Sequence, residues 1–171
     1  MADGTLKVGT ITTSSGSGTI TIPSGVTLSG GVSNVAFLAT PSSTQTISNT
    51  TFTKILFQTE VLDTDSAYDA SNSTFTIPSG EGGVYIFYTN MRMPLSDGEE
   101  RLHIINVNGS NDYKSGVQFY PGANAPFYST ATMMLNLSAG DVIYQNVYVT
   151  SSGTRTTNTD YTYFGGYKLG T

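Results

Sequence analysis

Two segments of this 171-residue chain alternate as β-strands do, yet they carry apolar side chains on both faces. In the first segment the two faces hold Val84, Ile86, Tyr88, Asn90 and Arg92, and Tyr85, Phe87, Thr89, Met91 and Met93. In the second segment they hold Val142, Tyr144, Asn146 and Tyr148, and Ile143, Gln145, Val147 and Val149. A strand with one face in water alternates apolar with polar residues, and these strands do not. Each of these strands therefore needs other protein segments packed against both of its faces.

The most economical way to cover such strands is a sandwich that associates with copies of itself. One face fills the sandwich core, and the other is covered most simply by a neighbouring subunit. No segment of the body shows the period of an amphipathic helix, and turn signals such as Asn108-Gly109 recur at the spacing of a sandwich. The sequence predicts an all-β antiparallel sandwich. We expect the following aromatic residues in its core or at the subunit interface: Tyr85, Phe87, Tyr144, Tyr148, Phe164 and Tyr167.

Charge and cysteine content exclude several function classes. The net charge at pH 7 is -5, and the seven Lys and Arg residues are scattered, so no contiguous positive stripe is available for a phosphate backbone. The chain has no cysteine, which excludes disulfides and thiolate metal sites. No stretch has the length and hydropathy of a signal peptide or a membrane span. We expect assembly in a cytosol, with no nucleic-acid binding and no membrane insertion.

Residues 1–34 differ from the head domain that we expect over residues 35–171. This arm is low in complexity and rich in Gly, Ser and Thr. Ordering about 30 such residues costs roughly 30–60 kcal/mol of conformational entropy. A few isolated apolar side chains cannot offset that cost on a monomer surface. We therefore expect the arm to intertwine with sister arms or to be clamped by another protein, with these anchoring residues: Leu6, Val8, Ile11, Ile20 and Ile22.

Five sequence elements occur in the order typical of one known family. They are Tyr68-Asp69 with Phe75-Thr76 and Pro78, Gly83-Val84-Tyr85-Ile86-Phe87, Val107-Asn108-Gly109, Leu137 with Gly140-Asp141 and Ile143, and Tyr163 to Leu169. In this order they resemble the trimeric jelly roll shared by the globular head of the first complement component and tumour necrosis factor. The resemblance covers roughly Ala36 to Leu169. It implies a jelly-roll sandwich that forms a homotrimer.

The arm adds a second resemblance. It looks like the leaders on structural proteins of tailed bacteriophages, which also use this head on virion fibres and decorations. The chain lacks the collagen stalk, cysteines and signal peptide of secreted animal members. Together the two resemblances imply a virion protein.

Few residues offer catalytic chemistry. His103, the single histidine, lies in a strand-like segment on the face of Arg101 and Ile105, and no nucleophile elbow accompanies it. We interpret this histidine as structural. Acidic residues that could pair for glycan cleavage occur in turns, where carboxylates ordinarily cap the backbone: Asp63, Asp65, Asp69, Asp97, Glu99 and Glu100. We expect no enzymatic activity.

Asp63, Asp65 and Asp69 also place three hard oxygen ligands within seven positions, which is suitable chemistry for Ca²⁺. The glycine and the distal glutamate of a helical calcium-binding hand are missing. Some members of the resembling family hold calcium near the trimer axis, but no motif here matches theirs. Turn capping is the favoured interpretation, so we expect no cofactor, with Ca²⁺ as the alternative.

A candidate ligand face lies in the aromatic segment 111–129. Rings beside amide and carboxylate groups are what sugar binding uses, and this segment supplies Tyr113, Phe119, Tyr120 and Tyr128. The alternative is that these rings pack the loop or the subunit interface, which we favour.

These observations predict a non-enzymatic structural protein of a tailed-phage virion. It would be a homotrimeric capsid decoration or short head fibre, anchored by its arm to capsid or tail components. One alternative is a receptor-binding tail-fibre tip that recognises a host surface glycan. Another is a ligand-binding module of the complement-head type outside any virus.

Overall fold

The computed structural model describes residues 34–96, 98–119 and 128–170, with side chains throughout except at 114–119 and 170. The predicted anchoring residues of the arm lie outside the described residues. Within the described ranges the chain forms strands and turns but no helix, so none of it could span a membrane as a helix. The prediction of an all-β antiparallel sandwich is confirmed.

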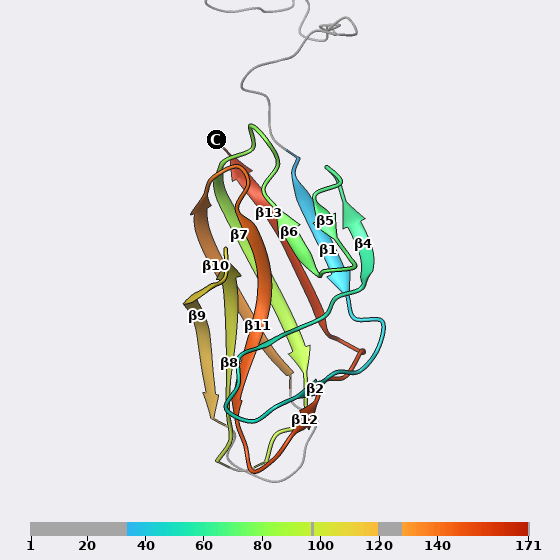
Figure 1. Cartoon of the computed structure of the whole chain (residues 1–171), viewed down its shortest axis with the longest axis vertical. Coiled ribbons are helices and arrows are strands. Elements are labelled where there is room, and N and C mark those ends of the chain that lie inside the picture. The colour runs from blue at the N-terminus through green and yellow to red at the C-terminus, as the bar shows by residue number, and fades with distance from the viewer. Residues whose placement is uncertain (1–33, 97, 120–127, 171) are drawn as a thin grey trace, which may run out of the picture. The chain divides into compact units, whose positions relative to one another are not determined.

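The first layer is a five-stranded antiparallel sheet. Its order is β10-β7-β13-β1-β4. The strands are β1 (Ala36–Thr40), β4 (Thr59–Asp63), β7 (Gly83–Arg92), β10 (Tyr128–Leu137) and β13 (Tyr163–Gly170). Strands far apart in sequence are neighbours here, because β13 lies between β1 and β7 (Figure 1).

The second layer is a six-stranded antiparallel sheet. Its order is β5-β6-β11-β8-β9, and β3 pairs with β11 beyond the end of β6. The strands are β3 (Thr53–Lys54), β5 (Tyr68–Asp69), β6 (Thr74–Thr76), β8 (Glu100–Val107), β9 (Ser110–Phe119) and β11 (Val142–Thr150). A two-stranded ladder joins β2 (Thr46–Ile47) to β12 (Arg155–Thr156).

Aromatic side chains fill the space between the two sheets. Phe37 stacks on Phe75 across the sandwich, with ring centroids 4.4 Å apart, and meets Phe164 edge to face at 5.1 Å. The core-facing side of β7 contributes Tyr85 and Phe87, both fully buried. Such ring pairs add to the stabilisation from burial and fix the spacing of the layers.

The turn at Asn108-Gly109 forms as its sequence predicts. Both residues have positive φ, 52° and 89°, which is the backbone of the two-residue hairpin favoured by Asn-Gly. The Asn108 side chain also donates to the Asp141 carboxylate at 2.7 Å and accepts from the Val142 amide at 2.8 Å. The hairpin is therefore tied to the neighbouring turn between β10 and β11.

Candidate functional site

The outer side of the five-stranded sheet carries exposed apolar side chains on several of its described strands. Residues directly opposite one another in antiparallel strands project to the same side of a sheet, so the ladder register gives the membership of this surface. Its two central rows run across the strands as Leu62, Leu38, Gly165, Tyr88 and Thr132, and as Ala36, Tyr167, Ile86 and Met134. We call these two rows the assembly face.

The side chains of this face are partly in water. Met134 is 61% exposed, Leu62 47% and Tyr167 41%, while Ile86, Tyr88 and Leu38 are half-buried by their neighbours. Scattered exposed apolar residues are ordinary, but contiguous ones mark interaction surfaces. A face of this kind is suited to association.

Two consecutive glycines shape the sheet at the centre of the assembly face. A Cβ on Gly165 would lie 2.7 Å from the Tyr88 ring and hydroxyl, so the ring rests directly on the backbone of β13. A Cβ on Gly166 would lie 2.6 Å from the Phe87 ring, on the core side. Burial raises the pKa of Tyr88, and the neighbouring Tyr163 and Tyr167 act in the same direction. The Tyr88 hydroxyl therefore stays neutral at physiological pH.

The same outer surface is aromatic and charged at the end where β7 finishes and β10 begins. The Arg92 guanidinium lies 5.8 Å from the centroid of the Tyr128 ring, and Tyr128 meets Tyr161 edge to face at 5.3 Å. Arg92 also approaches Asp160 at 3.7 Å. Tyr161 has a positive φ of 62°, and the Asn90 amide donates to its carbonyl. That hydrogen bond helps to hold the strained residue in place.

A buried polar chain links the two sheets through His103. Thr89 on β7 donates to Gln145 Oε1 at 2.6 Å, and Gln145 Nε2 then donates to His103 Nδ1 at 2.9 Å. With the Gln145 amide oriented in this way, His103 carries its proton on Nε2 and donates it to Ser129 Oγ at 2.5 Å. Burial, aided by the charge of Arg101, lowers the pKa of His103 to about 3.

This arrangement is not that of a nucleophile with its base. A base must accept the serine proton, whereas His103 donates to Ser129, and both side chains are almost completely buried. The geometry agrees with the structural interpretation of this histidine.

A second buried polar contact joins the loop before β8 to the start of β12 and to the segment between β11 and β12. Arg155 binds the Glu99 carboxylate through Nε at 2.8 Å and also through Nη2, and the amides of Ser96 and Ser152 donate to the same carboxylate. Burial alone would raise the pKa of Glu99, but the hydrogen bond from Arg155 and those from the two backbone amides lower it overall. Glu99 is thus ionised at neutral pH and joins Arg155 to the backbone at Ser96 and Ser152.

The sequence and the fold together identify the family. The family model for the C1q domain matches residues 36–169. The chain belongs to the C1q domain family. No curated protein sequence matches the chain. Among solved structures it resembles the globular domain of zebrafish complement 1qA, at 16% identity and a TM-score of 0.56, over 80% of this chain and 98% of that one. It also resembles murine APRIL crystallised at pH 5.0, at 14% identity and a TM-score of 0.57, over 80% of this chain and 100% of that one.

Within the C1q domain, the residues predicted for core or interface divide into three groups. Tyr85, Phe87 and Phe164 are in the core, and Tyr167 is on the assembly face. Tyr144 and Tyr148 lie on the outer side of the other sheet, next to residues of the same chain. The Tyr148 ring lies 5.0 Å from that of Phe52, and Lys54 Nζ lies 4.5 Å above the Tyr144 ring. For β11 the chain itself thus supplies part of the second cover that sequence reasoning assigned to a neighbouring subunit.

The candidate aromatic ligand face is not assembled among the described side chains. Tyr113 is exposed on β9 of the six-stranded sheet, whereas Tyr128 begins β10 of the other sheet and contacts Tyr161. The side chains of Phe119 and Tyr120 lie outside the described residues. Sugar binding by this segment stays a prediction.

Two of the three acidic residues considered for Ca²⁺, Asp63 and Asp69, cap turns. Asp63 accepts from the amides of Asp65 and Tyr68, and Asp69 accepts from Ser71 and Asn72. Hydrogen bonds from the side chains of Ser71 and Asn72 lower the pKa of Asp69 to about 2. Among the described residues, no group of three or more acidic, histidine or cysteine side chains is placed to hold a metal.

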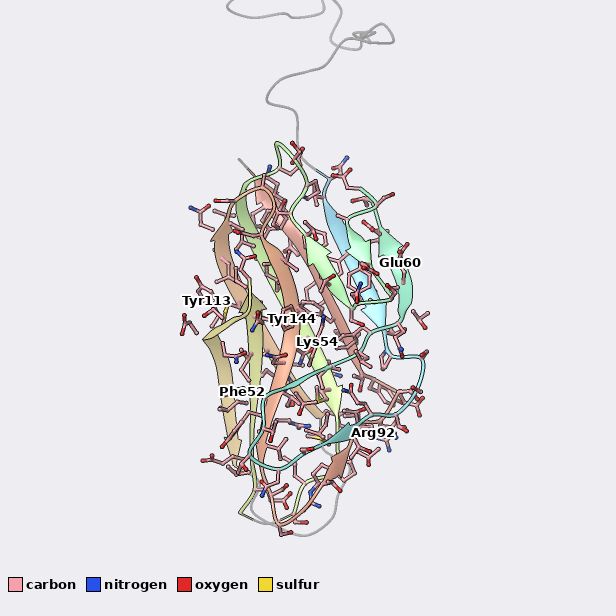
Figure 2. The ribbon with its side chains drawn as sticks, in the orientation of Figure 1. Phe52, Lys54, Glu60, Arg92, Tyr113 and Tyr144 are labelled. Atoms are coloured by element: carbon pink, nitrogen blue, oxygen red, sulfur yellow. The ribbon has the colours of Figure 1, made fainter. Side chains whose placement is uncertain are left out.

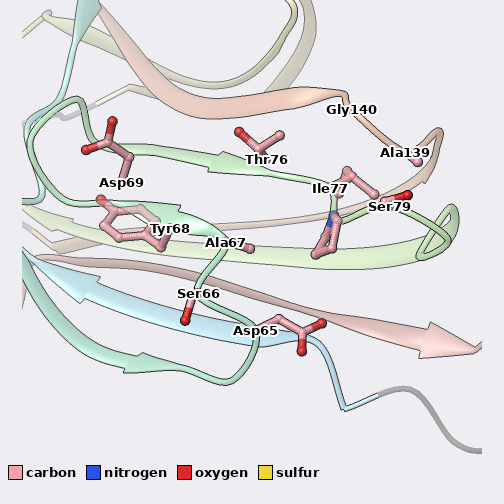
Figure 3. A pocket seen from close by; sticks show the side chains of 11 residues that line it. Asp65, Ser66, Ala67, Tyr68, Asp69, Thr76, Ile77, Ser79, Ala139 and Gly140 are labelled. Atoms are coloured by element: carbon pink, nitrogen blue, oxygen red, sulfur yellow. The ribbon is translucent and has the colours of Figure 1, made fainter.

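An open groove of about 670 Å³ passes between these turns. It is lined by Asp65, Tyr68 and Asp69 together with residues 76–79 and the turn at 139–140. Figure 3 shows the Asp65 and Asp69 carboxylates lying apart along it. The two carboxylates therefore do not converge on one ligand.

Sequence reasoning missed several members of the assembly face, namely Ala36, Leu38, Leu62 and Met134. Met134 had a usable signal, because it breaks the polar face of Thr130, Thr132 and Asn136 on β10. The other three lie in short strands whose partners are distant in sequence, and no local pattern indicates which of their sides faces outward.

Proposed function

We propose that the protein is a non-enzymatic display protein that assembles as a homotrimer through the assembly face. The observation that carries the proposal is the contiguous outer apolar surface of the five-stranded sheet, with Met134, Tyr167 and Leu62 in water. Removing each square ångström of such a surface from water contributes about 25 cal/mol. Domains of the C1q and tumour necrosis factor class are typically trimeric, non-enzymatic ligand-binding modules, which supports three copies rather than two.

The charge distribution supports association of this face with itself. Its two rows carry no ionisable group other than tyrosine, so copies bring no buried unpaired charge to the interface. The polar chain from Thr89 to Ser129 lies inside the sandwich and is independent of association. Each subunit is therefore suited to fold first and assemble afterwards.

The biological setting that we propose is the virion of a tailed phage. The protein would be a capsid decoration or short head fibre, held to capsid or tail components by residues 1–34 and displaying the C1q domain outward. Support comes from the low-complexity arm ahead of the domain and from the lack of a basic surface or cysteine framework. The arm would anchor the particle-bound trimer, and the domain would meet the environment.

Sedimentation velocity of the full chain tests the assembly step. We expect a single species with the mass of three chains at micromolar concentration. A compact, soluble monomer at that concentration would contradict the proposal.

Deletion of residues 2–31 tests the virion step. The truncated chain should still form the trimer but should be absent from purified particles when it is the only copy expressed during infection. Normal incorporation of the truncated chain, or absence of the full chain from particles, would remove the anchoring role.

A further inference from the structure

The outer side of the six-stranded sheet carries a polar and aromatic cluster that assembly through the other sheet leaves accessible. It is formed where β3, β11, β8 and β9 lie side by side, and its members are Phe52, Lys54, Asn106, Asn111, Tyr144, Asn146 and Tyr148. Figure 2 shows Phe52, Lys54 and Tyr144 on this part of the domain. Among the described residues, this cluster contains a cation that makes no ion pair and a buried acceptor that receives no hydrogen bond.

The acceptor is fixed by a chain of three amides. The Gly109 backbone amide can only donate, and it donates to Asn106 Oδ1 at 2.8 Å, so Asn106 must turn its Nδ2 toward Asn111. Asn111 therefore presents Oδ1, which also accepts from Asn146 Nδ2 at 2.7 Å. Each amide orientation follows from the one before it, starting from a group that cannot flip.

This chain leaves Asn146 Oδ1 without a donor. The residue is 6% exposed, and its Oδ1 has no hydrogen-bond partner in the described part of the chain. Leaving a buried carbonyl unsatisfied costs about 1–3 kcal/mol, and native proteins rarely do so without a reason. Because this oxygen is buried, a donor from a ligand can reach it only if a neighbouring side chain moves aside.

Lys54 is that neighbour. It lies directly opposite Asn146 in the β3–β11 ladder, so the two side chains project to the same side of the sheet. Its ammonium lies over the Tyr144 ring, and none of the ion pairs among the described residues involves it. Burial lowers the pKa of Lys54, with the Asp69 carboxylate acting in the opposite direction. A partly buried cation thus lies over an aromatic ring and makes no ion pair among the described residues.

We propose that this cluster is a binding site for a carboxylate-bearing saccharide. The sugar carboxylate would pair with Lys54, drawing its ammonium from the Tyr144 ring, and a sugar hydroxyl would donate to Asn146 Oδ1. The rings of Tyr144, Tyr148 and Phe52 would lie against the apolar side of the sugar. A simple anion would fill only the first of these requirements, and a neutral sugar only the other two.

The site is independent of the proposed assembly. It lies on the six-stranded sheet, whereas the assembly face lies on the outer side of the five-stranded sheet. Saccharide binding can therefore be measured whatever oligomeric state sedimentation gives, and failure of one proposal does not decide the other.

Isothermal titration calorimetry of the full chain with 6′-sialyllactose, with a glucuronic-acid disaccharide and with neutral lactose tests the proposal. We expect at least one acidic saccharide to bind more tightly than lactose, and the two acidic probes distinguish sialic from uronic acid. Lys54→Met keeps the aliphatic stem but removes the charge, and it should weaken acidic-saccharide binding by about tenfold or more. Asn146→Leu should weaken it as well, by removing the acceptor.

The matched control is Arg92→Met, which removes one positive charge from the other sheet and should leave binding unchanged. The unfolding transition of each variant establishes whether it is folded. If Asn146→Leu does not fold, the comparison of the wild type with Lys54→Met tests the proposal by itself. The proposal is overturned if the wild type binds neither acidic saccharide, if lactose binds equally well, or if Lys54→Met keeps full affinity.

Discussion

The outer sides of the two sheets both carry tyrosines on long central strands, yet their surroundings differ. On the five-stranded sheet, Tyr167 and Met134 lie beside other apolar groups and are exposed. On the six-stranded sheet, Tyr148 has Phe52 as a ring partner and Tyr144 has Lys54 above it. The first surface is suited to burial against copies of itself, and the second to recognition of a polar molecule. The alternation pattern of a strand is thus compatible with either role, and its neighbours in the sheet select one.

A charge placed on the assembly face should have the largest effect on oligomeric state of all the substitutions considered. Met134→Asp should convert the proposed trimer to a monomer, because each interface would have to bury an unpaired carboxylate at a cost of several kcal/mol. Met134 is 61% exposed, so the isolated domain should still fold. Sedimentation velocity gives the oligomeric state. The matched variant on the other sheet, Phe52→Asp, should remain trimeric, and a trimeric Met134→Asp would refute the assignment of the face.

The two consecutive glycines of β13 lie against opposite sides of the sheet, so substitutions at them should have different effects. Gly166→Ala drives a Cβ into the Phe87 ring and should lower the free energy of unfolding by about 1–3 kcal/mol. Gly165→Ala strains the backbone near the Phe37 carbonyl and displaces Tyr88, so it should also weaken the trimer. Chemical denaturation and sedimentation report the two effects. Gly153→Ala, where a Cβ meets nothing within 4 Å, is the control. If both substitutions in β13 dissociated the trimer equally, the assignment of Gly165 to the assembly face and of Gly166 to the core would be contradicted.

Acid should weaken the link between the two sheets. Folded His103 stays neutral down to a pKa of about 3, whereas the unfolded chain binds a proton near pH 6.5. Because the unfolded state takes up the proton first, stability is full above about pH 6.5 and falls as the pH drops, by roughly 2 kcal/mol at about pH 5. Denaturation at several pH values measures this slope, and His103→Gln should reduce it. An unchanged slope in this variant would assign the acid sensitivity to other groups.

The smallest expected effect is at the ring contact on the six-stranded sheet. Phe52→Ala removes the partner of Tyr148 and should lower the free energy of unfolding by about 0.5–1.5 kcal/mol without changing the oligomeric state. Thermal unfolding and sedimentation of the same sample check both parts. Dissociation of the trimer by this substitution would show that both outer surfaces take part in assembly.

Several features of the fold follow from local patterns. The two faces of β7 separate as its alternation predicts, with Tyr85 and Phe87 inside and Ile86 outside. The Asn108-Gly109 turn forms because few other dipeptides tolerate two consecutive positive φ values. The single histidine, His103, could be interpreted as structural from the sequence, because no nucleophile elbow accompanies it.

The candidate sites were less predictable because their members meet only through non-local pairing. Asn146 lies opposite Lys54 across an interval that no sequence pattern spans, and its missing donor follows from the orientations of two further asparagines. The aromatic segment around Tyr113 and Tyr128 shows the reverse case, since side chains close in sequence are placed on different sheets. Proximity along the chain is a poor guide to a surface in a sandwich.

The sequence by itself determined that this chain forms strands with two apolar sides, and its ordered motifs determined the C1q family. Those properties depend on side-chain alternation and turn chemistry, which act over a few residues. Only the tertiary structure decided which outer side stays apolar and open and which receives a cation, amides and a ring partner. The physical reason is that lateral neighbours in a sheet come from distant parts of the chain, and their chemistry sets the environment of each exposed side chain.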